Sequence, residues 1–177
     1  EGDALQLNPA YYFVHDRVQQ AAYSLIDENH KKHVHLKIGK LILENIPESD
    51  PEEHLFDIVN HLNFAIELIT ESITGPREQE KLAQLNLLAG KKAKKAAAYN
   101  PALRYLKTGI RLLQEDAWNQ QYDLTLELYT EAAKAAFLTT DFEQMEQFAE
   151  LGLSRAKTNL EQAKIHEVRI QAYTSQI

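Results

Sequence analysis

The sequence predicts an all-α protein built from antiparallel helical hairpins that stack on one another. Three observations support this fold class. Apolar residues recur at intervals of three and four through most of the 177 residues, which is the spacing of one face of an α-helix. A helical stretch, a break and a second helical stretch follow one another between residues 82 and 113. The same pattern returns 43 positions further along the chain.

The stretch from Leu82 to Leu113 is the unit on which the fold prediction depends. Small residues recur in it at helical spacing, namely Ala89, Gly90, Ala93, Ala97, Ala102 and Gly109. Small residues that face each other allow two helices to approach closely. The break is Asn100-Pro101. Because Asn is a good N-cap and Pro is tolerated in the first helical turn, we expect the second helix to begin there.

The second copy of this unit runs from Ala132 to Ala156. Its break is Asp141, followed three residues later by Gln144, which is a capping-box pattern. The matched positions are Ala89 and Ala132, Ala93 and Ala136, Tyr99 and Phe142, Tyr105 and Phe148, Gly109 and Gly152, and Ile110 and Leu153. Self-similarity at a period of roughly 20 to 50 residues predicts stacked repeats. The alternative is two ordinary helical hairpins in an irregular bundle.

Three helices are expected before this unit. The aromatic and β-branched run at residues 11–14 is the only convincing strand candidate, and its partner would lie within residues 1–7 or outside this sequence. His15 or Asp16 is expected to cap the first helix. The expected helices cover about residues 16–26, 33–45 and 51–73, with a polar turn at 27–32 and breaks at Pro47 and at 74–76.

Three more helices are expected after the unit. Residues 116–120 form a turn, where Trp118 should pack at the corner. The helices should run from about Tyr122, from 142 to about 158, and from about Leu160 to the end. A terminal repeat normally carries a polar cap, whereas the last helix has the apolar residues Ile165, Val168, Ile170, Ala172, Tyr173 and Ile177. The array is therefore expected to be truncated at its C-terminus.

The composition excludes several classes of function. The chain has no Cys, so it has neither a disulfide framework nor a thiol nucleophile, and this fits a cytoplasmic protein. Its formal net charge of −7 disfavours nucleic acid and anionic membranes as partners. No apolar run approaches the ~18 residues that span a bilayer. Neither a phosphate loop, a GxGxxG fingerprint nor a GxSxG elbow occurs, so we expect no catalysis from this segment.

The histidines and lysines offer weaker candidates. His54, Asp57 and His61 follow helical spacing and could form a metal site in a helical bundle, although solvated or groove-facing side chains are the simpler interpretation and no metal site is predicted. His30, His33 and His35 surround a helix start and are expected to be solvated. The densest basic cluster is Lys91, Lys92, Lys94 and Lys95, which lies in the last turns of a helix, where cations complement the helix dipole.

The pattern of small residues, an aromatic residue and Gly between 82 and 156 resembles the tetratricopeptide (TPR) repeat. This resemblance implies hairpins stacked in a right-handed superhelix over residues 30–177, with a groove for a protein or peptide. Two features depart from the family pattern. The period exceeds the usual ~34 residues, and the consensus Trp and closing Pro are missing. A TPR-like array is therefore the prediction.

The segment Phe13-Val14-His15-Asp16-Arg17-Val18, with the Ala-Ala-Tyr that follows it at residues 21–23, resembles the end of the winged-helix domain in STAND-class signalling ATPases. Val14 replaces the Met of that family. The resemblance assigns residues 1–29 to the end of such a winged helix. It also implies that His15 faces the phosphates of bound ADP and that Asp16 caps the helix. An imidazole can donate a hydrogen bond to phosphate. ATP or ADP with Mg would then bind another part of the longer protein that contains this segment, and the segment itself would hold no cofactor.

Several short stretches of the sequence between Tyr11 and Ile170 resemble the region that follows the ATPase module in very large bacterial and fungal signalling proteins. These join a Ser/Thr-kinase-like domain, a STAND-type ATPase, helical repeats, a GAF domain and a sensor histidine kinase. The resemblance implies a non-catalytic segment that relays the state of the ATPase to the kinase and contacts neighbouring domains. The isolated segment would be a monomer or weak dimer. The alternatives are a sensor array of a STAND-type transcription activator, or a free-standing scaffold.

Overall fold

The computed structural model describes residues 16–45, 53–72 and 75–175. In these ranges every regular element is a helix, which confirms the predicted all-α class. The helices are α1 (Asp16–Ser24), α2 (Glu28–Glu44), α3 (Leu55–Phe64), α4 (Ile66–Thr70), α5 (Gly75–Lys95), α6 (Tyr99–Arg111), α7 (Ala117–Gln120), α8 (Tyr122–Leu138), α9 (Phe142–Arg155) and α10 (Asn159–Thr174). The strand candidate at 11–14 and His15 lie outside the described residues, so the winged-helix remnant stays a prediction.

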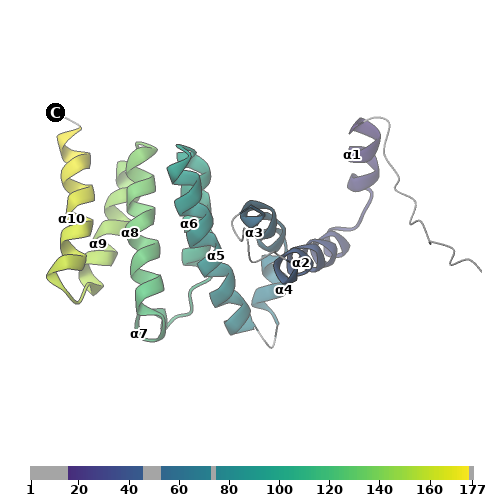
Figure 1. Ribbon diagram of the computed structural model, residues 1–177, viewed down its shortest axis with the longest axis horizontal. Helices are drawn as coiled ribbons and strands as arrows, with labels where there is room; N and C mark the ends of the chain where they lie inside the picture. The colour runs from purple at the N-terminus through teal and green to yellow at the C-terminus, as the bar shows by residue number, and fades with distance from the viewer. Residues whose placement is uncertain (1–15, 46–52, 73–74, 176–177) are drawn as a thin grey trace, which may run out of the picture.

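Two helical hairpins form at the two recurring stretches. Helices α5 and α6 pair in the first and α8 and α9 in the second, and α10 packs against both members of the second hairpin. Figure 1 shows α5, α6, α8, α9 and α10 side by side, with α1 beyond α2 at the opposite end of the molecule. Stacked hairpins are therefore present, while a TPR-like superhelix and its hand remain predictions.

The two hairpin turns have the same backbone structure at the same offset of 43 residues. In the first, Ala97 has a left-handed φ of 57°, and the N–H of Ala98 donates to the carbonyl of Ala93 at 2.9 Å. In the second, Thr140 has a φ of 60°, and the N–H of Asp141 donates to the carbonyl of Ala136 at 2.9 Å. This is the Schellman arrangement that ends many helices. The sequence offset thus corresponds to a repeated turn.

The small residues make the close helix contacts that the sequence predicted. A Cβ added at Gly90 of α5 would lie 2.6 Å from Cγ of Leu106 on α6. One added at Gly109 of α6 would lie 2.7 Å from Cδ2 of Leu128 on α8. Leu106 and Leu128 are both fully buried. The absence of a side chain at these glycines therefore lets large core residues of the neighbouring helix reach the backbone.

Several predicted helix boundaries were wrong. Helix α6 begins at Tyr99 rather than at Asn100, because the Schellman turn reverses the chain before that residue. Helix α2 begins at Glu28, inside the predicted turn at 27–32, because the Asp27 carboxylate accepts a hydrogen bond from the N–H of His30 at 3.1 Å. The expected third helix is divided into α3 and α4 at Ala65.

The predictions for the second hairpin were more accurate. Helix α8 begins at Tyr122 and α9 at Phe142, as expected. The Asp141 carboxylate accepts a hydrogen bond from the N–H of Gln144 at 3.0 Å, which is the capping contact that the sequence indicated. Trp118 lies at the predicted corner and stacks on Tyr129 with ring centroids 5.4 Å apart.

Candidate functional site

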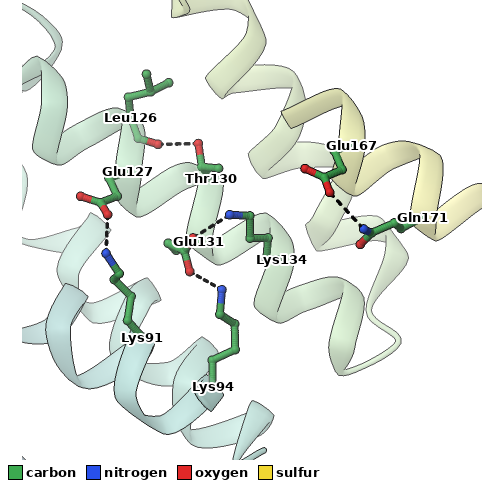
Figure 2. Close-up of polar contacts among 9 residues, drawn as sticks. All are labelled: Lys91, Lys94, Leu126, Glu127, Thr130, Glu131, Lys134, Glu167 and Gln171. Carbon is green, nitrogen blue, oxygen red and sulfur yellow. Dashed lines mark hydrogen bonds and ion pairs between the residues drawn. The ribbon is translucent and has the colours of Figure 1, made fainter. Parts of the chain in front are cut away.

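One face of the array is formed by α5, α8 and α10, and ion pairs connect two of these helices. The ammonium of Lys91 on α5 lies 2.6 Å from the carboxylate of Glu127 on α8. One turn further along, Lys94 pairs with Glu131. Figure 2 shows both contacts, made by residues three apart on α5 and four apart on α8. This spacing places each pair of side chains on one side of its helix.

Glu131 is the most enclosed charge on this face, because its residue is only 7% exposed. Its carboxylate accepts hydrogen bonds from Lys94 and from Lys134, the latter at 2.8 Å. Burial by itself raises the pKa of Glu131, but the hydrogen bonds from Lys134 and Lys94 outweigh burial, so the pKa lies below its ordinary value. Glu131 is therefore ionised at neutral pH, and it holds two lysines at the α5–α8 junction.

A groove of about 430 Å³ lies along α8 and the start of α10. Its lining is mainly polar and consists of Asp123, Leu126, Glu127, Thr130, Glu131, Lys134, Glu161 and Lys164. The lining thus contains four carboxylates and two ammonium groups. Small-molecule sites are mostly apolar and enclosed, so this groove suits a polar segment of a protein better than a small ligand. We call it the α8–α10 groove.

A second hollow, of about 260 Å³, lies between α2, the α3–α4 region and α5. Its floor is apolar and formed by Leu43, Leu62, Ile69, Leu82 and Leu85. At its rim the ammonium of Lys40 lies 2.6 Å from the carboxylate of Glu78. This ion pair connects α2 to α5 across the hollow and helps to fix the first helices on the array.

The basic cluster of α5 does more than complement a helix dipole. Lys91 and Lys94 reach across to α8, as described above. Lys92 lies over the ring of Phe56 on α3, 5.6 Å from its centroid. Glu127 and Glu131 were not predicted as partners of this cluster. Their spacing of four on a predicted helix was the signal that could have identified a matching acidic side.

The histidines are arranged differently from the expectations. His54 and Asp57 approach to 3.8 Å, but the ring of His61 turns toward His35, with the two Nδ1 atoms 2.9 Å apart. In the ranges that the structure describes, no group of three or more Asp, Glu or His side chains could hold a metal ion. His35 is half-buried rather than solvated. His33 Nδ1 lies 2.7 Å from the carbonyl oxygen of Asn29.

Comparisons with known proteins give one informative match. The chain is 29% identical, over 191 aligned residues and 94% of its length, to a protein of Dictyostelium discoideum described as hybrid signal transduction histidine kinase G. The match spans only 5% of the length of that relative. No family model matches the chain, and no solved structure matches it either. The chain is thus similar to one segment of a signal-transduction histidine kinase.

None of the helices in the described part of the chain combines the length and the apolar character needed to cross a membrane.

Proposed function

We propose that this chain is a non-catalytic protein-interaction and signal-relay segment of a large signalling kinase. In that protein it would couple a STAND-type ATPase to a histidine-kinase output. The observation that carries the proposal is the similarity to one stretch of a hybrid histidine kinase over 94% of the chain. The sequence also lacks phosphate-loop and nucleophile-elbow motifs, which favours a binding role over catalysis.

The α8–α10 groove is the surface that would hold a partner. Its occupant would be a segment of a neighbouring domain of the same protein, or a separate peptide. Because Lys91 and Lys94 pair with Glu127 and Glu131 of the lining, acidic and basic groups balance there, which favours a polar occupant of mixed charge. The contacts of Lys91 and Lys94 with α8 would transmit a shift of α8 to the first hairpin. An ion pair that separates leaves both charges without a partner, and this cost opposes a movement of α8 alone.

The ATPase end of this relay would lie at the N-terminus. His15 would contact the nucleotide phosphates only when the upstream ATPase is present, and ATP or ADP with Mg would bind that domain. In the protein that carries this segment, His15→Ala should therefore change the response of the kinase to the nucleotide state of the ATPase. His166→Ala, at an exposed position of α10, is the matched control and should leave that response unchanged.

A charge-reversal experiment tests the groove directly. Asp123→Lys reverses an exposed charge of the lining and leaves the Lys91–Glu127 ion pair intact. Glu143→Lys makes the same change of charge at an exposed position of α9. In the complete kinase, only Asp123→Lys should alter the dependence of histidine autophosphorylation on the ATPase.

Two results would overturn the proposal. One is an intact regulation of the kinase after deletion of residues 53–175. The other is ATPase or kinase activity of the isolated chain. The transcription-activator alternative predicts a DNA-binding domain in the same protein instead of a kinase, and the similarity to a hybrid histidine kinase disfavours it.

A further inference from the structure

Two histidines from different helices face each other where α2 meets α3. Nδ1 of His35 on α2 lies 2.9 Å from Nδ1 of His61 on α3, and the two ring centroids are 4.7 Å apart. Both residues are half-buried. The contact is a hydrogen bond if one nitrogen carries a proton and the other does not. With both protons on the Nε2 atoms, the two Nδ1 lone pairs are instead available to one metal ion.

The separation of the two nitrogens suits a particular coordination geometry. An imidazole nitrogen lies ~2.0–2.1 Å from a metal ion that it binds. At that distance, two nitrogens 2.9 Å apart subtend an angle of about 90° at the ion. Neighbouring ligands in the square-planar and tetragonal sites of Cu²⁺ and Ni²⁺ have this angle, whereas the tetrahedral sites of Zn²⁺ require a wider one.

The surroundings of His35 prepare its Nδ1 for a metal. The hydroxyl of Tyr23 on α1 lies 2.8 Å from Nε2 of His35, so Nε2–H can donate to this oxygen while Nδ1 keeps its lone pair. Metal-binding histidines usually donate their second N–H in this way, which fixes the tautomer. Phe64 of α3 stacks on the ring of His35, with centroids 4.1 Å apart. Burial lowers the pKa of His35, and His61 lowers it further, so this imidazole is neutral at neutral pH.

The cations nearest to the pair along α2 are compensated. The ammonium of Lys31, one turn before His35, lies 2.6 Å from the carboxylate of Glu28. Lys32 pairs with Glu67 of α4. A bound cation would therefore not meet an unpaired ammonium from either lysine. Since no cluster of three or more Asp, Glu or His occurs in the described ranges, water would fill the remaining coordination positions.

We propose that His35 and His61 bind a divalent transition-metal ion, Cu²⁺ in preference to others, and that this ion links α2 to α3. Two coordinate bonds would replace the hydrogen bond between the rings. The proton between the two Nδ1 atoms would move, through water, to the free Nε2 of the ring that carried it, so no net proton is released. Cu²⁺ is preferred because it binds nitrogen ligands more tightly than the other divalent first-row ions do. This inference is independent of the proposed signalling role.

Calorimetric titration of the 177-residue chain with Cu²⁺ is the first test. The parent chain should bind Cu²⁺, whereas Mg²⁺, which prefers oxygen ligands, should give no such binding. His35→Gln and His61→Gln should each lower the Cu²⁺ affinity at least about tenfold, since loss of an outer-shell partner alone costs ~10–100-fold.

His54→Gln is the matched control for this titration. His54 lies 3.8 Å from Asp57 and offers the competing pair of a histidine and a carboxylate on α3. Its replacement should leave the Cu²⁺ affinity unchanged. The proposal is overturned if the parent chain and both variants of the His35–His61 pair bind Cu²⁺ equally, or if His54→Gln lowers the affinity as much as they do.

Electron paramagnetic resonance of the Cu²⁺-loaded chain identifies the ligands directly. Electron spin echo modulation should show two coordinated imidazoles in the parent and in His54→Gln, and one in His35→Gln or His61→Gln. At ~10 times the Kd of the parent chain, Cu²⁺ should raise its thermal midpoint by about 3–6 °C and should raise those of the two variants much less. Circular dichroism checks that the variants keep their helices. A single coordinated imidazole in the parent chain would also overturn the proposal.

Discussion

Asn63 of α3 and Asn86 of α5 exchange two side-chain hydrogen bonds, each 2.9 Å long. Asn86 is fully buried and also donates to the carbonyl of Leu82 at 2.9 Å. The pair satisfies the amide groups of both residues at the junction of α3 with the first hairpin. Because two amides fit each other in few geometries, the pair also helps to fix the register of α3 on α5.

Asn63→Ala should destabilise the chain by about 1–3 kcal/mol, because it leaves the buried amide of Asn86 with unsatisfied groups. Replacing both residues by Leu should cost less than the sum of the two single Leu substitutions, since no polar group then remains unpaired. Urea denaturation of the parent chain and the three Leu variants measures this coupling. Additive losses of stability would contradict the interpretation of the pair as one unit.

Gly90→Ala should be destabilising although Ala favours helices. The new Cβ would meet Cγ of the buried Leu106 at 2.6 Å, and overpacking of this kind costs about 1–3 kcal/mol. The higher helix propensity of Ala offsets about 1 kcal/mol of this cost. Gly152→Ala is the matched comparison, because the closest atom to its Cβ would be the terminal methyl of Ile165, at 3.0 Å, and the next atoms would be at 3.9 Å. Thermal melting should therefore show a clear loss for Gly90→Ala and little change for Gly152→Ala.

Glu131→Gln should lower the free energy of unfolding by about 1–3 kcal/mol at neutral pH, because hydrogen bonds to a charged carboxylate are lost at an enclosed position. The pKa of Glu131 in the folded chain lies below its ordinary value of 4.5. Its ionisation therefore adds stability above about pH 4.5, and this contribution is lost as the pH falls through the lower folded-state pKa. The difference in the free energy of unfolding between the parent chain and Glu131→Gln should therefore decrease as the pH falls through that acidic range.

Glu127→Gln is the control for this experiment. The side chain of Glu127 is 47% exposed, and an exposed ion pair is worth under about 1 kcal/mol. Chemical denaturation at several pH values measures both variants. A Glu131→Gln effect that does not depend on pH would contradict the role assigned to its charge.

The sequence predicted the helical class and the two hairpins because these depend on periodic apolar and small residues. Gly90 and Gly109 lie at the close contacts that their positions in the pattern indicated. The start of α6 was missed for a different reason. Asn100 carries a good capping signal, but the preceding turn is set by the left-handed backbone at Ala97, and Ala gives no sequence signal for such a conformation.

The candidate site was less accessible to sequence analysis. Lys91 was recognised as part of a basic cluster, yet its partner Glu127 lies 36 positions away. Pairing across two hairpins depends on how the helices pack, and the local pattern does not specify this. The contact between His35 and His61 was missed for the same reason, since each histidine alone fits a solvated helix position.

The last prediction concerns the left-handed residues of the two hairpin turns. Ala97 has a φ of 57° and Thr140 a φ of 60°, a conformation that costs a residue with a Cβ roughly 1–2 kcal/mol. Ala97→Gly and Thr140→Gly should therefore stabilise the chain, by up to about 1 kcal/mol after the extra entropy of glycine in the unfolded chain is subtracted. Ala96→Gly, one residue earlier and without a positive φ, is the matched control and should destabilise by about 0.5–1 kcal/mol. Thermal melting of the three variants gives the comparison, and a loss of stability for Ala97→Gly equal to that of Ala96→Gly would show that the Schellman turn is not formed in solution.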